Sequence, residues 1–306
     1  MGRYLVGRLL QGVLVVFGVT VVVFVATRMI GDPVNFILPL SASQEQRDRL
    51  RSDLGFDRSL IDQFVDYIGD IFRLDFGTST KFTNEDTIDV VLRFLPKTIQ
   101  LVIAGMLVAF LVSLVLGMLS ALKPGKVTDK ILVTLSLFGL SMPQFFLAQV
   151  LIVVFSVRFG WVQIGPGPWT HMILPAVALA LPAIGRLAMT VRSAMIDELN
   201  SQYVKAARAK GIRRRRVVAV HALRNAAIPF VTLAGWEFIR ALAGFTVVVE
   251  GVFGLNGMGS LAILAIRERD FFLIQTIVLV VAIIVVLVNI LIDLAYKAVD
   301  PRVKLG

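Results

Sequence analysis

Long apolar runs are the feature that most restricts how this chain can fold. Six of them reach about 20 residues or more, which is the length that a helix needs to cross a membrane. The first ends at about Met29, and the others occupy 96–122, 131–157, 172–192, 229–252 and 272–296. With 57% hydrophobic residues among 306, the composition is too apolar for a soluble domain of this size. We therefore expect an all-α integral membrane protein with six transmembrane helices.

The distribution of basic residues predicts the orientation. Seventeen Lys and Arg fall before the first run, in the loops between the second and third and between the fourth and fifth, and after the sixth. The short loops on the other side carry only Arg158, Arg267 and Arg269. Cytoplasmic loops are enriched in basic residues. We expect a multi-pass membrane protein, surrounded by membrane lipid, with both termini in the cytoplasm.

The sequence carries no recognisable catalytic or metal-binding motif. It has no Cys and only two His, which lie far apart in the chain, so no metal site is expected. A GxxxxGK[ST] phosphate loop, a GxSxG elbow and an HExxH helix are also absent. The net charge of +10 collects at the ends of the apolar runs, which does not favour a nucleic-acid partner. We expect a chain that is not an enzyme and binds no cofactor.

The segment 31–95 is expected to form a small helical insertion outside the cytoplasm. Ser43 with Gln46, and Ser59 with Asp62, have the spacing of helix starts, whereas Gly55 and Gly77 are typical of helix ends. The second helix has an apolar stripe that could lie on the outer membrane face, cover the mouth of a pathway, or pack on the transmembrane helices. The stripe consists of Leu60, Ile61, Phe64, Val65, Ile68, Ile71 and Phe72.

The polar, basic loop 193–228 separates the fourth and fifth runs. Its apolar and small residues recur at helical spacing until Gly211, where we expect a helix to end. A second helical pattern follows and is expected to end at Ile228 and Pro229. A face made of small residues can be approached closely by another protein, so the loop is a candidate docking surface. A solvated loop that only sets the orientation is the alternative.

Several polar residues and prolines lie inside the apolar runs. Glu237 and Arg240 are three residues apart on one helical face, so we expect them to pair, either to hold helices together or to recognise a zwitterionic substrate. Arg186 could extend to the cytoplasmic surface, and Glu250 could lie in water. The candidates for a translocation pathway or another intramembrane role are Pro182, Arg186, Glu237, Arg240, Glu250, Asn289 and Asp293. The alternative is a helix kink for Pro182, and helix packing for Glu237, Arg240, Asn289 and Asp293.

The basic loop resembles the EAA loop of ABC importer permeases, specifically that of the dipeptide/oligopeptide/nickel permease family. The similar segments are YVKAARAKGI at 203–212 and HALRNAAIP at 221–229. Lys205 stands where the general pattern has glutamate, which departs from the wider family. Further similar segments are GDPV at 31–34, LGFDRSL at 54–60, DFGTS at 75–79, RFLPKT at 93–98, GLSMPQF at 139–145, HMILPAVALALP at 171–182, VVVEGVFGLNGMG at 247–259, RERDFFLIQ at 267–275 and LVNILIDLAYKAVDPR at 287–302. They cover almost the whole chain.

The resemblance implies a permease subunit of a bacterial or archaeal cytoplasmic (inner) membrane that forms half of a translocation pathway. It implies a second homologous permease subunit, two nucleotide-binding ATPase subunits that hold ATP and Mg²⁺, and an extracytoplasmic substrate-binding protein. The domains would be the helix 1–30, the insertion 31–95, and a core of five helices in 96–306 that includes the coupling loop 193–228. The residues implied to contact the ATPase are Tyr203, Lys205, Ala206, Ala207, Lys210 and Gly211.

Two other functions remain open at this stage. An ion-coupled secondary carrier would bind its ion at Glu237, Asp293 or Glu250. A membrane scaffold would use the basic loop to recruit a soluble protein. The substrate of an importer also remains open among peptides, nickel chelates, glutathione and haem.

Overall fold

The computed structural model describes residues 2–29, 34, 38, 42–83 and 85–299. Regular secondary structure in these residues is helical, apart from an isolated antiparallel bridge between Thr78 and Asp86. The expected all-α class is therefore confirmed for the described part of the chain. Most of the GDPV segment and the C-terminal residues 300–306 lie outside the described residues.

Five helical stretches are long and apolar enough to cross a membrane: Val6–Met29, Thr87–Leu122, Trp169–Asn200, Arg214–Gly244 and Phe271–Leu294. They correspond to α1 (Gly2–Met29), α5 (Thr87–Leu122), α8 (Ile173–Asn200), α11 (Leu223–Arg240) and α14 (Phe271–Val299) with the short helical turns that adjoin some of them. Two bent helix pairs raise the number of candidate spans in the described residues to as many as seven.

The first bent pair replaces the straight helix expected over 131–157. α6 (Val127–Ser141) and α7 (Gln144–Leu151), which continues into the π-helix η1 (Ile152–Arg158), meet at 107°. The cause is Pro143, because a proline disfavours the helical conformation of the residue before it. Met142 is accordingly extended, with φ −79° and ψ 130°.

The second bent pair follows the fifth long helix. α12 (Thr246–Phe253) and α13 (Met258–Glu268) meet at 82°. Gly254 has a φ of +64° at this bend, a conformation that favours glycine. The chain therefore turns shortly after Glu250.

The helix that was expected to end at Pro229 continues through it. Pro229 lies inside α11, and the helical path extends from the short α10 (Arg214–Arg216) and the π-helix η3 (Val217–Ala222) through α11 and the π-helix η4 (Ala241–Phe245) to α12. Proline removes one N–H donor from a helix. The wider π-helical turns on either side relax the regular hydrogen-bond pattern of this helix.

Clustering of contacts divides the chain into two compact units. Unit 1 contains residues 1–96 and 256–286, and unit 2 contains residues 97–255 and 287–306. A core of unit 1 joins the start of α5 with α13 and α14. It consists of Val90, Val91, Met258, Leu261, Ala265, Leu273 and Ile277.

The insertion in unit 1 begins its two helices where the sequence predicts. α3 (Gln44–Asp53) starts with the complete capping box of Ser43 and Gln46, and α4 (Leu60–Arg73) starts at Ser59, whose hydroxyl accepts the backbone N–H of Asp62. α4 ends at Leu74, which itself has a φ of +61°, so Gly77 lies beyond the helix end instead of forming it. The backbone of Leu74, a residue with a side chain, thus adopts the left-handed conformation that was expected of a glycine.

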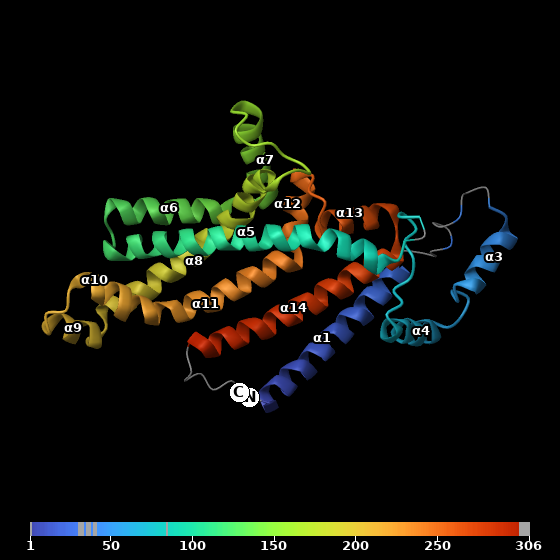
Figure 1. Cartoon of the computed structure of the whole chain (residues 1–306), viewed down its shortest axis with the longest axis horizontal. Helices are drawn as coiled ribbons and strands as arrows, with labels where there is room; N and C mark the ends of the chain where they lie inside the picture. The colour runs from blue at the N-terminus through green and yellow to red at the C-terminus, as the bar shows by residue number, and fades with distance from the viewer. Residues whose placement is uncertain (1, 30–33, 35–37, 39–41, 84, 300–306) are drawn as a thin grey trace. The chain divides into compact units, whose positions relative to one another are not determined.

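In unit 2, α8 packs closely against both α5 and α6 (Figure 1). A Cβ atom added to Gly117 of α5 would lie 2.5 Å from Cβ of Val191 and 2.7 Å from the carbonyl oxygen of Ala188. One added to Gly185 of α8 would lie 2.6 Å from the carbonyl oxygen of Ser136 in α6. Glycine therefore sets how closely these helices approach one another.

Candidate functional site

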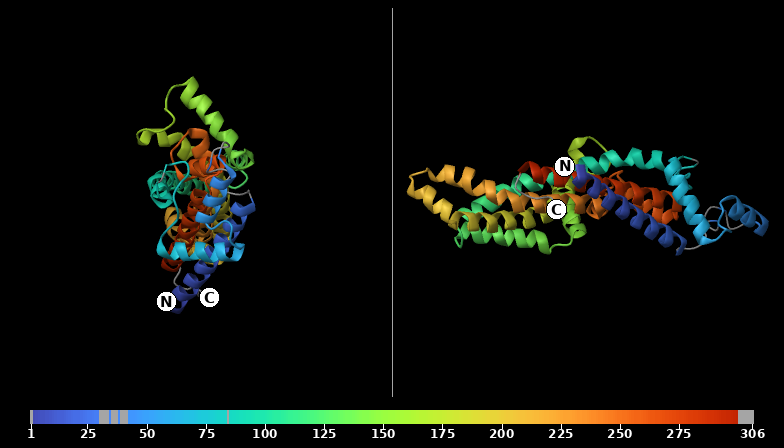
Figure 2. Two further views of the ribbon diagram at one scale, coloured as in Figure 1. Left: turned by 90° about the vertical axis from the view of Figure 1, so that its right-hand side faces the viewer. Right: turned by 90° about the horizontal axis from the view of Figure 1, so that it is seen from below.

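The basic loop forms a small helical hairpin at one end of unit 2. α9 (Gln202–Ala209) follows α8, and the chain returns through α10 and η3 into α11. Figures 1 and 2 show α9 and α10 beyond the ends of α8 and α11. Gly211 has a φ of +73° and follows the last turn of α9, where the N–H of Ile212 donates to the carbonyl of Ala207 at 3.2 Å. The expected helix end at Gly211 is confirmed.

This hairpin has a hydrophobic core of its own. Val204 and Ala207 of α9 pack against Val217 of η3 and against Ile212. Ala207 is thus directed inward, whereas Ala206 beside it is exposed, as are Tyr203, Lys205, Lys210 and Gly211. The resemblance implied an ATPase contact for both Ala206 and Ala207. In the structure, Ala207 belongs to the core of the hairpin, whereas Ala206 lies on its outer surface.

Tyr203 of α9 connects α8 and α11, the helices that lead into and out of the hairpin. The hydroxyl of Tyr203 donates to the carboxylate of Glu198 at the end of α8 and accepts Nδ2 of Asn225 in α11 at 3.0 Å. Partial burial, together with the hydrogen bond to Glu198, raises the pKa of Tyr203 above its ordinary value. The phenol is protonated at neutral pH and donates to Glu198.

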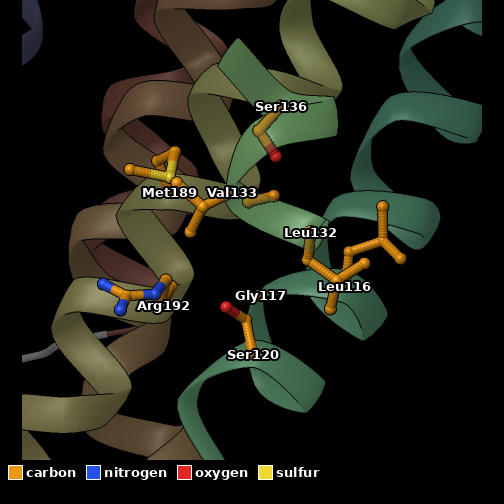
Figure 3. A pocket seen from close by; sticks show the side chains of 9 residues that line it. Leu116, Gly117, Ser120, Leu132, Val133, Ser136, Met189 and Arg192 are labelled. Carbon is orange, nitrogen blue, oxygen red and sulfur yellow. The ribbon is translucent and has the colours of Figure 1, made fainter. Parts of the chain in front are cut away.

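Near the hairpin, an ion pair fixes the base of α6 to α8. Arg192 of α8 donates from Nε and Nη2 to the two carboxylate oxygens of Asp129 at 2.6 and 2.8 Å. Asp129 is 3% exposed and also accepts the hydroxyl of Ser120 in α5 and the N–H of Gly125 at 2.7 Å. Figure 3 shows Arg192, Ser120 and Ser136 around a pocket where α8, α5 and α6 meet. The sequence reasoning missed this pair, although Asp129 was visible as an acid in a basic loop.

A second ion-pair cluster lies nearer the middle of the helices. Glu237 of α11 is 1% exposed, and Arg186 donates to its two carboxylate oxygens from Nε and Nη2 at 2.6 and 2.7 Å. Arg240, one turn along α11, contributes a longer contact of 3.4 Å and has a side chain that is 49% exposed. Glu237 and Arg240 do meet, but Arg186 is the principal partner of Glu237. Two cations on one carboxylate leave the cluster with a net charge of +1.

The other candidate residues are not gathered into this cluster. Glu250 is 1% exposed and accepts the hydroxyl of Thr98 in α5 at 2.6 Å, so it is buried and not in water. Pro182 lies inside α8, which remains one continuous helix. On α14, Asp293 is buried and Asn289, one turn earlier, is exposed. Within the described part of the chain, no three His, Asp or Glu side chains lie close enough together to hold a metal ion.

Comparison with known proteins identifies the family of the chain. The family model described as binding-protein-dependent transport system inner membrane component matches residues 113–305. A probable peptide ABC transporter permease protein of Sinorhizobium fredii is 33% identical over 314 residues, with 99% of this chain and 100% of the relative covered. A glutathione transport system permease protein of Pectobacterium atrosepticum is 35% identical over 304 residues, with 99% of each chain covered.

Solved structures give the same fold. An inward-facing structure of the MetNI methionine ABC transporter has a chain that aligns with a TM-score of 0.58 at 19% identity, covering 69% of this chain and 96% of that one. A chain of an amino acid ABC transporter with histidines aligns with a TM-score of 0.54 at 18% identity, covering 69% and 94%. The chain therefore belongs to the family of binding-protein-dependent transport system inner membrane components, and it is a multi-pass, non-catalytic permease subunit of an ABC importer.

Proposed function

We propose that this chain forms half of the translocation pathway of an importer for peptides or similar small substrates. The proposal of a peptide substrate rests on the names of relatives that are 33–35% identical over the full length, which include a probable peptide permease and glutathione permeases. The complete importer would contain a second homologous permease subunit, two ATPase subunits in the cytoplasm and a substrate-binding protein on the other side.

The observation that carries the proposal is the exposed hairpin at one end of unit 2. Its outer surface combines the small side chain of Ala206 with the cations of Lys205 and Lys210, and its internal core allows it to move as one body. We infer that Tyr203, Lys205, Ala206, Lys210 and Gly211 contact an ATPase subunit, and that Ala207 maintains the shape of this surface.

Movement of the hairpin would reach the membrane through α8. Glu198 and Tyr203 join α9 to α8, and the Arg192–Asp129 pair joins α8 to α6. We propose that α8 thus passes the closure of the ATPase subunits to the region around Arg186 and Glu237. Alternating access requires contacts that differ between inward- and outward-open states, and the longer contact of Arg240 is a candidate for such a change.

The proposed membrane arrangement has six crossings with both termini in the cytoplasm. The bent pair of α6 and α7 would count as one crossing, while α12 and α13 would re-enter the membrane without crossing it. In this arrangement the helix 1–30 and the insertion 31–95 precede a core of 96–306 that contains the coupling loop 193–228.

Substitution of Ala206 tests the proposed coupling surface. A bulky residue in a close contact costs about 1–3 kcal/mol, so Ala206→Trp should weaken binding of the ATPase subunits about 5- to 150-fold. Binding is measured by co-purification, and coupling by substrate-stimulated ATP hydrolysis in reconstituted membranes. Ala206→Ser controls for substitution at this position and Arg215→Gln for loss of charge in the loop. Normal assembly and coupling of Ala206→Trp would contradict the docking role.

A further inference from the structure

An apolar groove runs between α1 and α4 in unit 1. It has a volume of about 390 Å³ and is lined by Val21, Phe24, Val25, Arg28, Met29, Leu60, Ile61 and Phe64. Arg28 supplies the charge in this lining, and the remaining side chains are apolar. Neither the proposed translocation pathway nor the coupling hairpin uses this groove.

Contacts between aromatic rings show that α4 lies at the level of the apolar part of α1. Phe64 packs edge-on against Phe17 and Phe24, with ring centroids 6.1 and 5.2 Å apart, and Tyr67 stacks on Phe24 at 5.8 Å. Phe17 and Phe24 both belong to the candidate span Val6–Met29. Phe17 lies roughly three turns before Met29 along the helix. The contact of Phe64 with Phe17 therefore places part of α4 beside the interior of this span and not only beside its end.

Four apolar side chains of α4 are largely exposed. Ile61 is 75% exposed and Phe72 is 83% exposed, and Leu60 and Val65 are also largely exposed. The polar residues of α4 occupy its other face. A helix with a strongly apolar face and a charged face is typical of the membrane interface, where the apolar face enters the acyl-chain region. In the proposed membrane arrangement, a groove bordered by such a face would open toward lipid.

Arg28 is held at the edge of this groove by three contacts. Its guanidinium lies 4.9 Å from the ring centre of Phe24 and 4.6 Å from that of Phe56, and its Nε donates to Oε1 of Gln63 at 2.9 Å. These contacts fix the plane of the guanidinium through its Nε edge. Among the described residues, no carboxylate forms a salt bridge with Arg28.

The neighbouring acids on α4 have other partners. Asp66 pairs with Arg58 at 2.5 Å, and Asp62 accepts the hydroxyl of Ser59 at 2.7 Å. Among the described residues, the positive charge of Arg28 is therefore available to an external anion. Arginine binds phosphate oxygens through paired N–H donors, and such charge-assisted hydrogen bonds are strong.

We propose that the groove binds one anionic diacyl phospholipid, with its phosphate on Arg28 and one acyl chain between α1 and α4. The proposed orientation assigns this lipid to the outer leaflet. Arg28 lies next to the apolar groove at the end of α1. A phospholipid has a charged phosphate next to its hydrocarbon chains, so its phosphate could contact Arg28 while a chain occupies the groove. The bound lipid would cover the exposed face around Ile61 and fix α4 on α1.

Native mass spectrometry of the purified full-length chain with phosphatidylglycerol tests the charge requirement. Arg28→Gln should weaken binding of the most tightly held phosphatidylglycerol about tenfold or more. Arg73→Gln is the matched control, because Arg73 is an 81% exposed arginine at the end of α4, the other helix that borders the groove. This variant should bind the lipid as the wild type does. Equal affinity in all three proteins would overturn the proposal.

A fluorescence measurement tests the acyl chain without changing Arg28. The chain has no cysteine, so Val65→Cys beside the groove can carry a single fluorophore. Phosphatidylglycerol with brominated acyl chains should quench this fluorophore at lower mole fractions than brominated phosphatidylcholine does. Equal quenching by the two lipids would show that Arg28 does not select an anionic lipid. Quenching by aqueous iodide but not by brominated lipid would show that the groove opens to water. Quenching by neither iodide nor brominated lipid would show that a protein covers the groove. Each of these results would contradict the proposal.

Discussion

Glu237 illustrates at the scale of single residues how two contacts to one carboxylate differ. Arg186 meets both carboxylate oxygens, whereas the half-exposed Arg240 reaches one at 3.4 Å. Removal of one partner of a buried ion pair costs about 3–5 kcal/mol, while half-exposed ion pairs contribute about 0–1 kcal/mol. The two arginines should therefore differ in their effects on stability.

Arg186→Gln should lower the free energy of unfolding by about 3–5 kcal/mol, and Arg240→Gln by about 1 kcal/mol or less. The measurement is the denaturation of each purified variant in detergent. Adding Glu237→Gln to Arg186→Gln should recover part of the loss, because no unpaired carboxylate then remains buried. Equal effects of the two arginine substitutions would show that the bidentate geometry is not what stabilises Glu237.

The sequence predicted only part of this cluster, because it shows neighbours on one helix but not across helices. Glu237 and Arg240 are three residues apart, so their contact followed from helical spacing. Arg186 lies on another helix, and its contact with Glu237 depends on how α8 and α11 pack. Asp129 and Arg192 were missed for the same reason. Local signals were more informative, since Ser43 and Gln46 form the expected capping box.

Helix elements in unit 2 are spaced by glycine, and this spacing predicts opposite effects for two similar substitutions. A methyl group on Gly117 would come within 2.7 Å of the backbone oxygen of Ala188 in α8, whereas one on Gly18 of α1 would meet nothing within 4 Å. Glycine inside a helix is less stable than alanine by about 0.5–1 kcal/mol. The packing around each glycine decides whether its replacement by alanine increases the stability of the protein.

Gly18→Ala should leave stability unchanged or raise it by up to about 1 kcal/mol, and Gly117→Ala should lower it by about 1–3 kcal/mol because α5 and α8 must move apart. Thermal unfolding of the purified variants, compared with the wild type, measures both. If Gly117→Ala were as stable as Gly18→Ala, the close contact of α5 with α8 would not be needed for packing.

Element boundaries could be predicted where a residue determines the backbone directly. Gly211 ends α9 with a positive φ as expected, because glycine adopts this conformation without strain. Pro229 did not end its helix, because the effect of a proline depends on whether the surrounding turns can lose a hydrogen bond. The inward position of Ala207 was also not predictable, since it depends on Val217 in the returning arm.

For the whole molecule, hydropathy predicted the helical class and most of the long spans but not the bends. The hydropathy of an apolar run is the same whether its helix continues straight or bends within the membrane. The run 131–157 contains Met142 and Pro143, where the backbone turns by 107°. The division into two compact units was not visible either, because 256–286 joins the N-terminal part of the chain through tertiary packing.

Orientation in the membrane is a property of the whole chain that single-cysteine labelling can measure. Ser52 lies on the exposed surface of α3, and Ala209 on the exposed surface of α9. The excess of basic residues around α9 should keep that hairpin in the cytoplasm. An impermeant thiol reagent added to intact spheroplasts should therefore label Ser52→Cys and not Ala209→Cys, and the cysteine-free wild type gives the background. After the membrane is permeabilised, both variants should react, which shows that each thiol is accessible. Labelling of Ala209→Cys alone in intact spheroplasts would reverse the proposed orientation and place the hairpin on the side away from any cytoplasmic ATPase.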